Sequence, residues 1–165
     1  MAVILIGGGA RSGKSRYALE KARSIEGSRG FVATARASDE EMTARIQHHR
    51  AERGNEFTTI EEPIELARII AEAKFGVLII DCLTLWLSNL MYANKTGEID
   101  ALLHAANATS STVIFVTNEV GSGIVPTDHS LSRDFRDQAG ILNQRIASIA
   151  AEVYFMIFGI PQRIK

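Results

Sequence analysis

The sequence predicts an α/β fold in which a mostly parallel β-sheet is flanked by helices. Three observations predict it. Short apolar runs alternate with longer segments of helical polar and apolar pattern. The runs are apolar at consecutive positions, as in strands that are covered on both faces. The first run also leads directly into a glycine-rich turn. At 165 residues the chain has the length of a single domain, residues 1–165.

The predicted strands are apolar runs of three to six residues. They are Val3–Ile6, Phe31–Ala33, Val77–Ile80, Val113–Val116 and Val153–Phe158. Gly159-Ile160-Pro161 breaks the last run, so we expect Gln162–Lys165 to fold back as a small antiparallel strand at the C-terminal edge of the sheet.

Two segments have the pattern of buried helices. Leu83–Met91 is apolar nearly all round, which predicts burial in the core or against another subunit. Leu131–Val153 carries one apolar stripe, which we interpret as core packing. Gly140 lies within it and costs about 1 kcal/mol relative to alanine, so it either allows a close contact or interrupts the helix. The stripe consists of Leu131, Phe135, Leu142, Ile146, Ile149 and Val153.

Composition and charge indicate in which cellular compartment the protein works and which classes of partner it binds. Hydrophobic residues make up 46% of the chain, charged residues 22%, and the net charge is -1, so nucleic acid is a poor default partner. The single cysteine, Cys82, excludes an internal disulfide framework and a cysteine-based zinc cluster. The apolar start Met1–Ile6 is too short for a signal peptide, and we find no run long enough to span a membrane. We therefore expect a cytoplasmic protein.

A phosphate-binding loop follows the first predicted strand. Its sequence, GGARSGKS, satisfies the pattern G-x-x-x-x-G-K-[ST] at every fixed position. Backbone N–H groups of such a turn surround a phosphate, Lys14 reaches the terminal phosphates, and the Ser15 hydroxyl can bind Mg²⁺. The strand context weighs against a chance glycine loop and indicates a RecA-like phosphate-loop NTPase. The loop residues are Gly8, Gly9, Ala10, Arg11, Ser12, Gly13, Lys14 and Ser15.

Two further segments should face the same ligand. Asp81 directly follows the apolar run Val77–Ile80. In many phosphate-loop proteins, a carboxylate at the end of such a strand holds the magnesium shell. The alternative for Asp81 is a structural role. Thr117–Pro126 follows the run Val113–Val116, and ligands of open parallel sheets bind at the edge where strands end. For this loop the alternative is a flexible connection.

A pair of histidines lies on a predicted helix that begins with a capping box at Ser38–Glu41. At 100° per residue, His49 falls near Met42 and Ile46, whereas His48 points away from them. His48 is therefore the freer ring. A neutral imidazole is a competent nucleophile toward phosphorus, but two ordinary surface or packed histidines would give the same spacing.

Several blocks of the chain, in order, resemble one enzyme family. Beside the phosphate loop they are FVATA at Phe31–Ala35, RIQHHR at Arg45–Arg50, DCLTLWLSNL at Asp81–Leu90, TNEVGSGIVP at Thr117–Pro126 and FRDQAGILNQRIA at Phe135–Ala147. Together they are similar to the bifunctional adenosylcobinamide kinase/adenosylcobinamide-phosphate guanylyltransferase family. The histidine pair and the block TNEVGSGIVP are the narrower signals.

The resemblance implies two reactions of adenosylcobalamin biosynthesis on a corrinoid, with Mg²⁺ as the metal. The first phosphorylates adenosylcobinamide with ATP or GTP. The second transfers GMP from GTP through a histidine, aligned here with His48, to give adenosylcobinamide-GDP and pyrophosphate. The resemblance also implies a homotrimer, with an interface near Trp86, and Arg45 and Arg50 are plausible phosphate clamps. Further nucleotide contacts implied are Ala33, Thr34, Ala35, His49, Arg50, Ala51, Glu52, Glu61, Glu62 and Asp81.

Two other functions remain open at this point. One is a plain small-molecule kinase in which His48 is only a surface residue. The other is a nucleotide-dependent switch that modifies no small molecule. The chain is also shorter than some relatives between Asn94 and Ala108, which puts in doubt any corrinoid contact that those relatives make there.

Overall fold

The computed structural model describes residues 2–35, 54–123 and 129–165. The predicted helix that carries His48 and His49 lies outside the described residues, as do the last positions of the Thr117–Pro126 block. The strands are β1 (Val3–Gly8), β2 (Arg29–Ala33), β3 (Phe57–Glu61), β4 (Val77–Asp81), β5 (Thr112–Val116), β6 (Glu152–Ile157) and β7 (Ile160–Arg163). The helices are α1 (Lys14–Arg23), α3 (Leu66–Glu72), α4 (Leu83–Ala93), α5 (Glu98–Ala108) and α6 (Ser130–Ile149), with a 3₁₀ turn at Gly54–Glu56.

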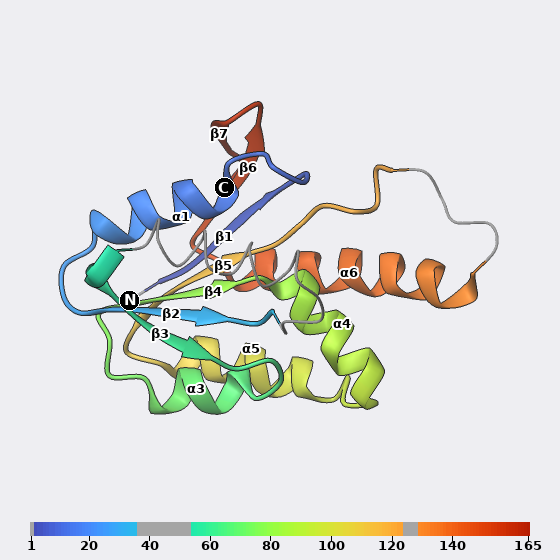
Figure 1. Ribbon diagram of the computed structural model, residues 1–165, viewed down its shortest axis with the longest axis horizontal. Helices are drawn as coiled ribbons and strands as arrows, with labels where there is room; N and C mark the ends of the chain where they lie inside the picture. Colours follow the sequence, from blue (N-terminus) through green and yellow to red (C-terminus); the bar gives the residue numbers. More distant parts are fainter. Residues whose placement is uncertain (1, 36–53, 124–128) are drawn as a thin grey trace.

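The seven strands form one sheet in the order β3-β2-β4-β5-β1-β6-β7 (Figure 1). Every neighbouring pair is parallel except β6 and β7, which are antiparallel. The predicted fold class is therefore confirmed, including its small antiparallel edge. In this order β5 lies between β1, which leads into the phosphate loop, and β4, which ends in Asp81.

The sheet is covered on both faces, which explains why its strands are apolar at consecutive positions. Along β4, Leu78 and Ile80 pack into a core with residues of α3, α4, α5 and α6, while Val77 and Ile79 pack into a second core with residues of α1. All four side chains are 0% exposed. Figure 1 shows α1 on one side of the strands and α3 and α5 on the other.

The sequence analysis missed β3 and misplaced the last strand. β3 is an edge strand with a partly exposed pattern, so the apolar run that we used as the strand signal is absent from it. β7 is Ile160–Arg163, where we had expected Gln162–Lys165, and the turn before it is Phe158-Gly159. Pro161 is accommodated within β7 because an edge strand leaves one side of its backbone without ladder partners.

The long C-terminal helix ends before the sequence analysis had placed its end. α6 stops at Ile149, and Val153 belongs to β6. Leu142 and Ile146 are buried, but Leu131 is 54% exposed, so our interpretation of the whole stripe as core packing was wrong at its first turn. Both alternatives for Gly140 were wrong as well. The helix runs through this position without interruption, and a Cβ there would meet no atom of the described residues within 4 Å.

The apolar helix after β4 is buried, as predicted. Leu83, Trp86, Leu87 and Leu90 of α4 are each 0% exposed. The Trp86 indole donates a hydrogen bond of 2.7 Å to the Ile64 carbonyl, which satisfies its polar atom in the core. Within the described ranges, no helix combines the length and apolar character needed to cross a membrane.

Candidate functional site

The carboxyl ends of the parallel strands place most of the predicted site residues along one edge of the sheet. Ala33 of β2 pairs in register with Glu61 of β3 and with Asp81 of β4. Asp81 in turn pairs with Val116, the last residue of β5. Because β1 ends beside them in the phosphate loop, the predicted phosphate, metal and base contacts gather at the edge where ligands of open α/β sheets bind.

The phosphate loop has the backbone geometry that its glycines permit. Gly13, the residue before α1, has φ +92°, which is favourable for glycine and strained for other residues. A Cβ on Gly8 would lie 2.8 Å from the Ser12 Oγ and 3.0 Å from the Met156 carbonyl oxygen, so the loop leaves no space for a side chain there. The N-cap residue of α1 is Gly13, which has no side chain to cap the first turn, and free N–H groups at a helix N-terminus bind anions.

Lys14 is the central charge of the loop. It is 7% exposed, and its ammonium group donates to the Gly9 carbonyl at 2.5 Å and to the Ser12 Oγ at 3.3 Å. Burial lowers the pKa of Lys14, and the negative charge of Asp81 opposes part of that shift. The loop lysine and the carboxylate at the end of β4 therefore act on each other electrostatically across the site.

A buried threonine fixes the backbone that follows Asp81. The Thr34 hydroxyl donates to the Cys82 carbonyl oxygen and accepts from the Cys82 N–H, both at 2.8 Å, and the Thr34 N–H donates to the Asp81 carbonyl oxygen at 3.1 Å. The Asn89 amide donates to the carbonyl oxygens of Thr34 and Pro63. The loops after β2, β3 and β4 are thereby joined, and the predicted contact residue Thr34 uses its hydroxyl to hold this edge together.

The single cysteine beside Asp81 is not an activated thiol. Cys82 is 7% exposed. Burial, together with the neighbouring negative charge of Asp81, raises the pKa of the Cys82 thiol to about 11. A thiol with this pKa is protonated at neutral pH and therefore a poor nucleophile.

The loop after β5 is tied to α4 and α6 by polar side chains. The Thr84 hydroxyl accepts from the Asn118 N–H at 2.8 Å and lies 3.5 Å from the Thr117 hydroxyl. The Thr117 hydroxyl also donates to the Asn143 side-chain oxygen at 2.7 Å. Sequence reasoning missed Thr84 and Asn143, because neither belongs to a local sequence motif that indicates its hydrogen-bond partner.

Glu119 links this loop to the phosphate loop. Its backbone N–H donates to the Gly8 carbonyl at 3.0 Å, and its carboxylate accepts from the N–H groups of Gly121 and Ser122. Burial alone would raise the Glu119 pKa, but the hydrogen bonds from Ser122 and Gly121 outweigh it and lower the pKa. The described part of this predicted connection is therefore held by specific hydrogen bonds at the site edge.

The two glutamates after β3 differ in their surroundings. Glu61 is the last residue of β3 and is exposed. The Glu62 carboxylate accepts hydrogen bonds of 2.9 Å from the N–H groups of Ile64 and Glu65 and lies 3.6 Å from the Arg68 guanidinium. Glu62 therefore has a structural task in the turn that leads into α3.

The donors available for a metal ion are few. Among the residues that the structure describes, no cluster of three or more His, Cys, Asp or Glu side chains could hold a metal by itself. A hydroxyl at Ser15 and a carboxylate at Asp81 remain. This set fits Mg²⁺ bound together with a nucleotide, because Mg²⁺ keeps several waters and takes only one or two protein ligands beside the phosphates.

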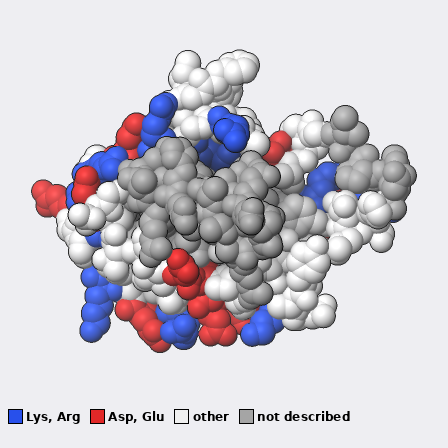
Figure 2. Space-filling view, viewed as in Figure 1, with Lys and Arg blue, Asp and Glu red and all other residues white. Residues whose placement is uncertain are grey.

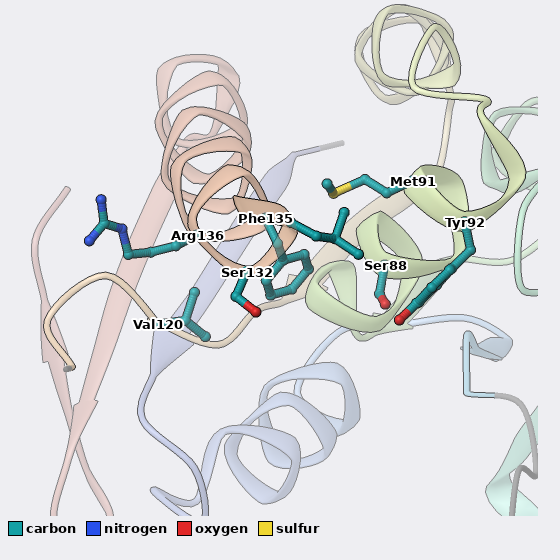
Figure 3. A pocket seen from close by; sticks show the side chains of 8 residues that line it. Ser88, Met91, Tyr92, Val120, Ser132, Phe135 and Arg136 are labelled. Atoms are coloured by element: carbon teal, nitrogen blue, oxygen red, sulfur yellow. The ribbon is translucent and has the colours of Figure 1, made fainter. Parts of the chain in front are cut away.

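A cavity of about 500 Å³ opens between α4, α6 and the loop after β5. In Figure 3, Met91, Ser88 and Tyr92 project from α4 toward Phe135 and Ser132 on α6. The lining is mostly apolar, and Tyr92 is 78% exposed. The cavity is lined by Ser88, Met91, Tyr92, Val120, Leu131, Ser132, Phe135 and Arg136.

The predicted nucleophile and its neighbours lie outside the described residues. They are Arg45, His48, His49, Arg50, Ala51 and Glu52.

Comparison with known proteins decides the family. A family model described as cobinamide kinase / cobinamide phosphate guanyltransferase matches residues 4–164. The chain belongs to this family. It is 44% identical over 167 residues to the bifunctional adenosylcobalamin biosynthesis protein CobP of Pseudomonas aeruginosa, covering 98% of this chain and 96% of that protein. It is 37% identical over 182 residues to the bifunctional adenosylcobalamin biosynthesis protein CobU of Escherichia coli K12, covering 99% of both.

Solved structures support the fold of this cobinamide kinase family member independently. An ATPase of the type III secretion system of pathogenic bacteria superposes with a TM-score of 0.56 at 11% identity, covering 98% of this chain and 56% of that one. At this identity the likeness concerns the fold alone, and it agrees with the phosphate-loop NTPase predicted from the sequence.

Proposed function

We propose that this chain catalyses two successive reactions on adenosylcobinamide. In the first, ATP or GTP donates its terminal phosphoryl group to the hydroxyl of the aminopropanol arm. In the second, GMP from GTP is joined to the new phosphate, which gives adenosylcobinamide-GDP and pyrophosphate. The observation that carries the proposal is the family match across residues 4–164, which includes both the phosphate loop and the histidine pair.

The phosphate loop supports the kinase step. The first-turn N–H groups of α1 and the Lys14 ammonium would surround the phosphates and spread the charge of the transferred group, so catalysis would rest on positioning and electrostatics. The Ser15 hydroxyl and Asp81 would hold Mg²⁺, which neutralises part of the phosphate charge when bound. Thr34 keeps the backbone at Asp81 in place for this role.

The second step requires attack at a different phosphorus. We propose that the His48 imidazole attacks the α-phosphorus of GTP, a P–N bond forms, and the bond to the β-phosphate oxygen breaks with release of pyrophosphate. A phosphate oxygen of adenosylcobinamide phosphate then attacks the same phosphorus and releases the imidazole. Proposed contacts of the nucleotides are Ala33, Thr34, Ala35, His49, Arg50, Ala51, Glu52, Glu61 and Glu62.

Labelling tests the histidine intermediate. Incubation with GTP labelled at the α-phosphate should label the protein in an acid-labile, alkali-stable form, as a phosphoramidate requires. The label should be absent from His48→Ala and present in the control His104→Ala, which replaces an exposed histidine of α5. Wild-type protein that acquires no label would contradict the proposal and favour a plain kinase.

Turnover of the variants tests how the two reactions are divided. Lys14→Ala should impair both, because both use a triphosphate, whereas His48→Ala should phosphorylate cobinamide and fail to transfer GMP. Asp81→Asn should raise the Mg²⁺ concentration needed for half-maximal turnover. Equal loss of both activities in a folded His48→Ala protein would contradict the division, and an unchanged Mg²⁺ response would remove Asp81 from the metal site. Nucleotide binding without any phosphorylated cobinamide would favour a nucleotide-dependent switch.

We also propose that the protein assembles as a homotrimer. Trp86 is fully buried within the chain, so the contact we expected near it must use other side chains of this region. Leu85 is 37%, Tyr92 78% and Leu131 54% exposed, and the last two line the cavity between α4 and α6. Light scattering should give three times the chain mass, and Tyr92→Asp should reduce it. A wild-type monomer would contradict the trimer, and an intact Tyr92→Asp trimer would contradict this contact face.

A further inference from the structure

The hydrogen bonds between β5 and β1 continue beyond the end of β5. The Thr117 N–H donates to the Ile6 carbonyl oxygen, and the Glu119 N–H donates to the Gly8 carbonyl oxygen, both at 3.0 Å. Because the backbone stays extended between these two bonds, Asn118 lies beside Gly8, the first residue of the phosphate loop.

Alternation along β5 shows which face of the sheet Asn118 occupies. Val116 packs into the core that contains residues of α1, whereas Phe115 packs into the core that contains residues of α4 and α6. Thr117 faces the same side as Phe115, because its hydroxyl donates to Asn143 of α6. Since successive side chains of an extended strand point to opposite faces, Asn118 lies on the face of α1.

The same face of the sheet carries the charged residues of the site. Lys14 and Ser15 begin α1 at the end of the phosphate loop. Asp81 follows Ile79 by two positions in β4, and Ile79 packs into the core that contains residues of α1, so Asp81 also lies on the α1 face. Because β5 lies between β1 and β4, the strand of Asn118 is about 4.8 Å, one strand spacing, from each of them. Asn118 therefore lies between the phosphate loop and Asp81.

Side chains of two helices hold the backbone of Asn118. Its N–H donates to the Thr84 hydroxyl of α4 at 2.8 Å, and its carbonyl oxygen accepts from the Asn143 amide of α6 at 3.5 Å. Its own side-chain amide is partly buried and has no hydrogen-bond partner among the residues that the structure describes. The fold therefore fixes the position of Asn118 and leaves its amide available to a ligand, as in a preorganised hydrogen-bond donor.

The ligand group expected at this point is the γ-phosphoryl group. The Lys14 ammonium, which reaches the terminal phosphates in loops of this kind, lies 2.5 Å from the carbonyl oxygen of Gly9, the residue after the one beside Asn118. In phosphate-loop proteins, the metal held by the loop hydroxyl and the strand carboxylate bridges the β- and γ-phosphates. Lys14 at the loop and Asp81 on β4 thus direct the terminal phosphate to the α1 face in front of β5.

We propose that the Asn118 side-chain amide donates a hydrogen bond to an oxygen of the γ-phosphoryl group as this group moves to adenosylcobinamide. This assignment rests on the proposed function and adds a catalytic residue to its kinase step. In that step the hydroxyl oxygen of the aminopropanol arm bonds to the γ-phosphorus, and the hydroxyl proton is released to water. The bond from the γ-phosphorus to the bridging oxygen breaks, and its electron pair stays on the nucleoside diphosphate. The neutral amide takes no proton and stabilises the charge of the transferred group.

The second reaction separates this role from a general role in nucleotide binding. GMP transfer breaks the bond between the α- and β-phosphates, so a donor at the γ-phosphate makes the same contact before and during that reaction. A contact that is equal in the ground state and the transition state does not change kcat. Loss of the Asn118 amide should therefore slow the kinase step and spare GMP transfer, the reverse of the pattern expected for His48→Ala.

The experiment measures the two reactions separately. Kinase turnover is followed with ATP, Mg²⁺ and adenosylcobinamide, and GMP transfer with GTP, Mg²⁺ and supplied adenosylcobinamide phosphate. The variants are Asn118→Ala, Asn118→Asp, which keeps the size but replaces the donor by an oxygen, and the matched control Asn107→Ala. Asn107 is an exposed residue of α5, on the other side of the sheet from α1. At the lower edge of the molecule, where α3 and α5 lie, Figure 2 shows acidic and basic side chains interspersed, as on an ordinary solvated surface.

Asn118→Ala should lower the kinase kcat about 100-fold, the effect of losing one transition-state donor. Its KM for ATP and its rate of GMP transfer should stay within about threefold of wild type. Asn118→Asp should lose at least as much kinase activity, because a carboxylate repels the phosphate oxygens. Asn107→Ala should resemble wild type in both reactions. All three variants should keep the wild-type midpoint of urea unfolding, because Thr84 and Asn143 hold only main-chain atoms of Asn118.

The outcomes distinguish this assignment from the proposed function. A kinase kcat within about threefold of wild type in either Asn118 variant would overturn the assignment while the protein remained a kinase. Equal losses in both reactions, or a lowered unfolding midpoint of Asn118→Asp, would also overturn it, because they indicate a structural role. Wild-type protein that forms no adenosylcobinamide phosphate would overturn the proposed function, and the Asn118 assignment with it.

Discussion

Replacing Thr34 by valine should measure how strongly one hydroxyl supports the end of β4. Valine nearly matches threonine in shape, and the Thr34 side chain is 0% exposed, so the change removes a polar group without opening a large cavity. Two hydrogen bonds of 2.8 Å to Cys82 are lost. The Cys82 carbonyl oxygen keeps a partner, because the Trp86 N–H also donates to it at 3.1 Å. The Cys82 N–H loses the hydroxyl that accepts its hydrogen bond.

The expected loss of stability follows from this difference between the Cys82 carbonyl oxygen, which keeps a partner, and the Cys82 N–H, which does not keep the Thr34 hydroxyl. A buried N–H without an acceptor costs about 1–3 kcal/mol, and a lost hydrogen bond to a group that keeps another partner costs about 0.5–1.5 kcal/mol. Thr34→Val should therefore lower the free energy of unfolding by about 2–4 kcal/mol. Thr34→Ser keeps the hydroxyl and loses one methyl group, so it should cost only about 1 kcal/mol.

Equilibrium urea unfolding at one fixed protein concentration measures both variants against wild type. Because Thr34 also positions the backbone at Asp81, the valine variant should require more Mg²⁺ for half-maximal turnover, whereas the serine variant should not. The reasoning is refuted if Thr34→Val is as stable as wild type, or if Thr34→Ser is the more destabilised of the two.

Three further predictions concern other parts of the molecule. Gly140→Ala should raise the free energy of unfolding by about 0.5–1 kcal/mol and Tm by about 1–4 °C in a thermal scan, because the added methyl meets no atom in a continuous helix; a lower Tm would contradict this. Glu152 accepts hydrogen bonds from Lys21 at 2.7 Å and from the Tyr154 hydroxyl at 2.5 Å, which lower its pKa. Its ionised form therefore stabilises the fold above the pKa of the unfolded chain, and this stability is lost as pH falls through the lowered value. Glu152→Gln should thus be less stable than wild type at pH 7 in urea unfolding, and the difference should shrink as pH falls through the lowered pKa of Glu152; a difference independent of pH would argue against the mechanism. Cys82, with its pKa raised to about 11, should resist alkylation at pH 8 until the protein is unfolded, and rapid labelling of the native protein would contradict its burial.

The strands that could be predicted are those covered on both faces. Val77–Asp81 and Thr112–Val116 lie inside the sheet, where burial of both faces requires apolar residues at consecutive positions. Phe57–Glu61 lies at the edge and is half exposed, so its residues did not form such a run. Its content of phenylalanine, threonine and isoleucine, which favour strands, is the signal that could have found it.

The site divides in the same way. The phosphate loop and Asp81 could be predicted, because a glycine-rich turn and a strand ending in a carboxylate are defined by local sequence. The polar side chains that hold the edge together could not. Thr84, Asn89 and Asn143 act through partners 25 to 55 positions away in the chain, and nothing near them in sequence indicates those partners. The resemblance to the family is the source of the proposed substrate and of the proposed histidine nucleophile, which spacing alone left undecided.

The strand inserted between β1 and β4 sets the width of the catalytic edge. Neighbouring strands lie about 4.8 Å apart, so two such steps hold the base of the phosphate loop and the base of Asp81 about 10 Å from each other. A short aspartate side chain spans only part of that distance. Ser15 and Asp81 would therefore hold a cation that keeps several of its own waters, as Mg²⁺ does where it has only one or two protein ligands.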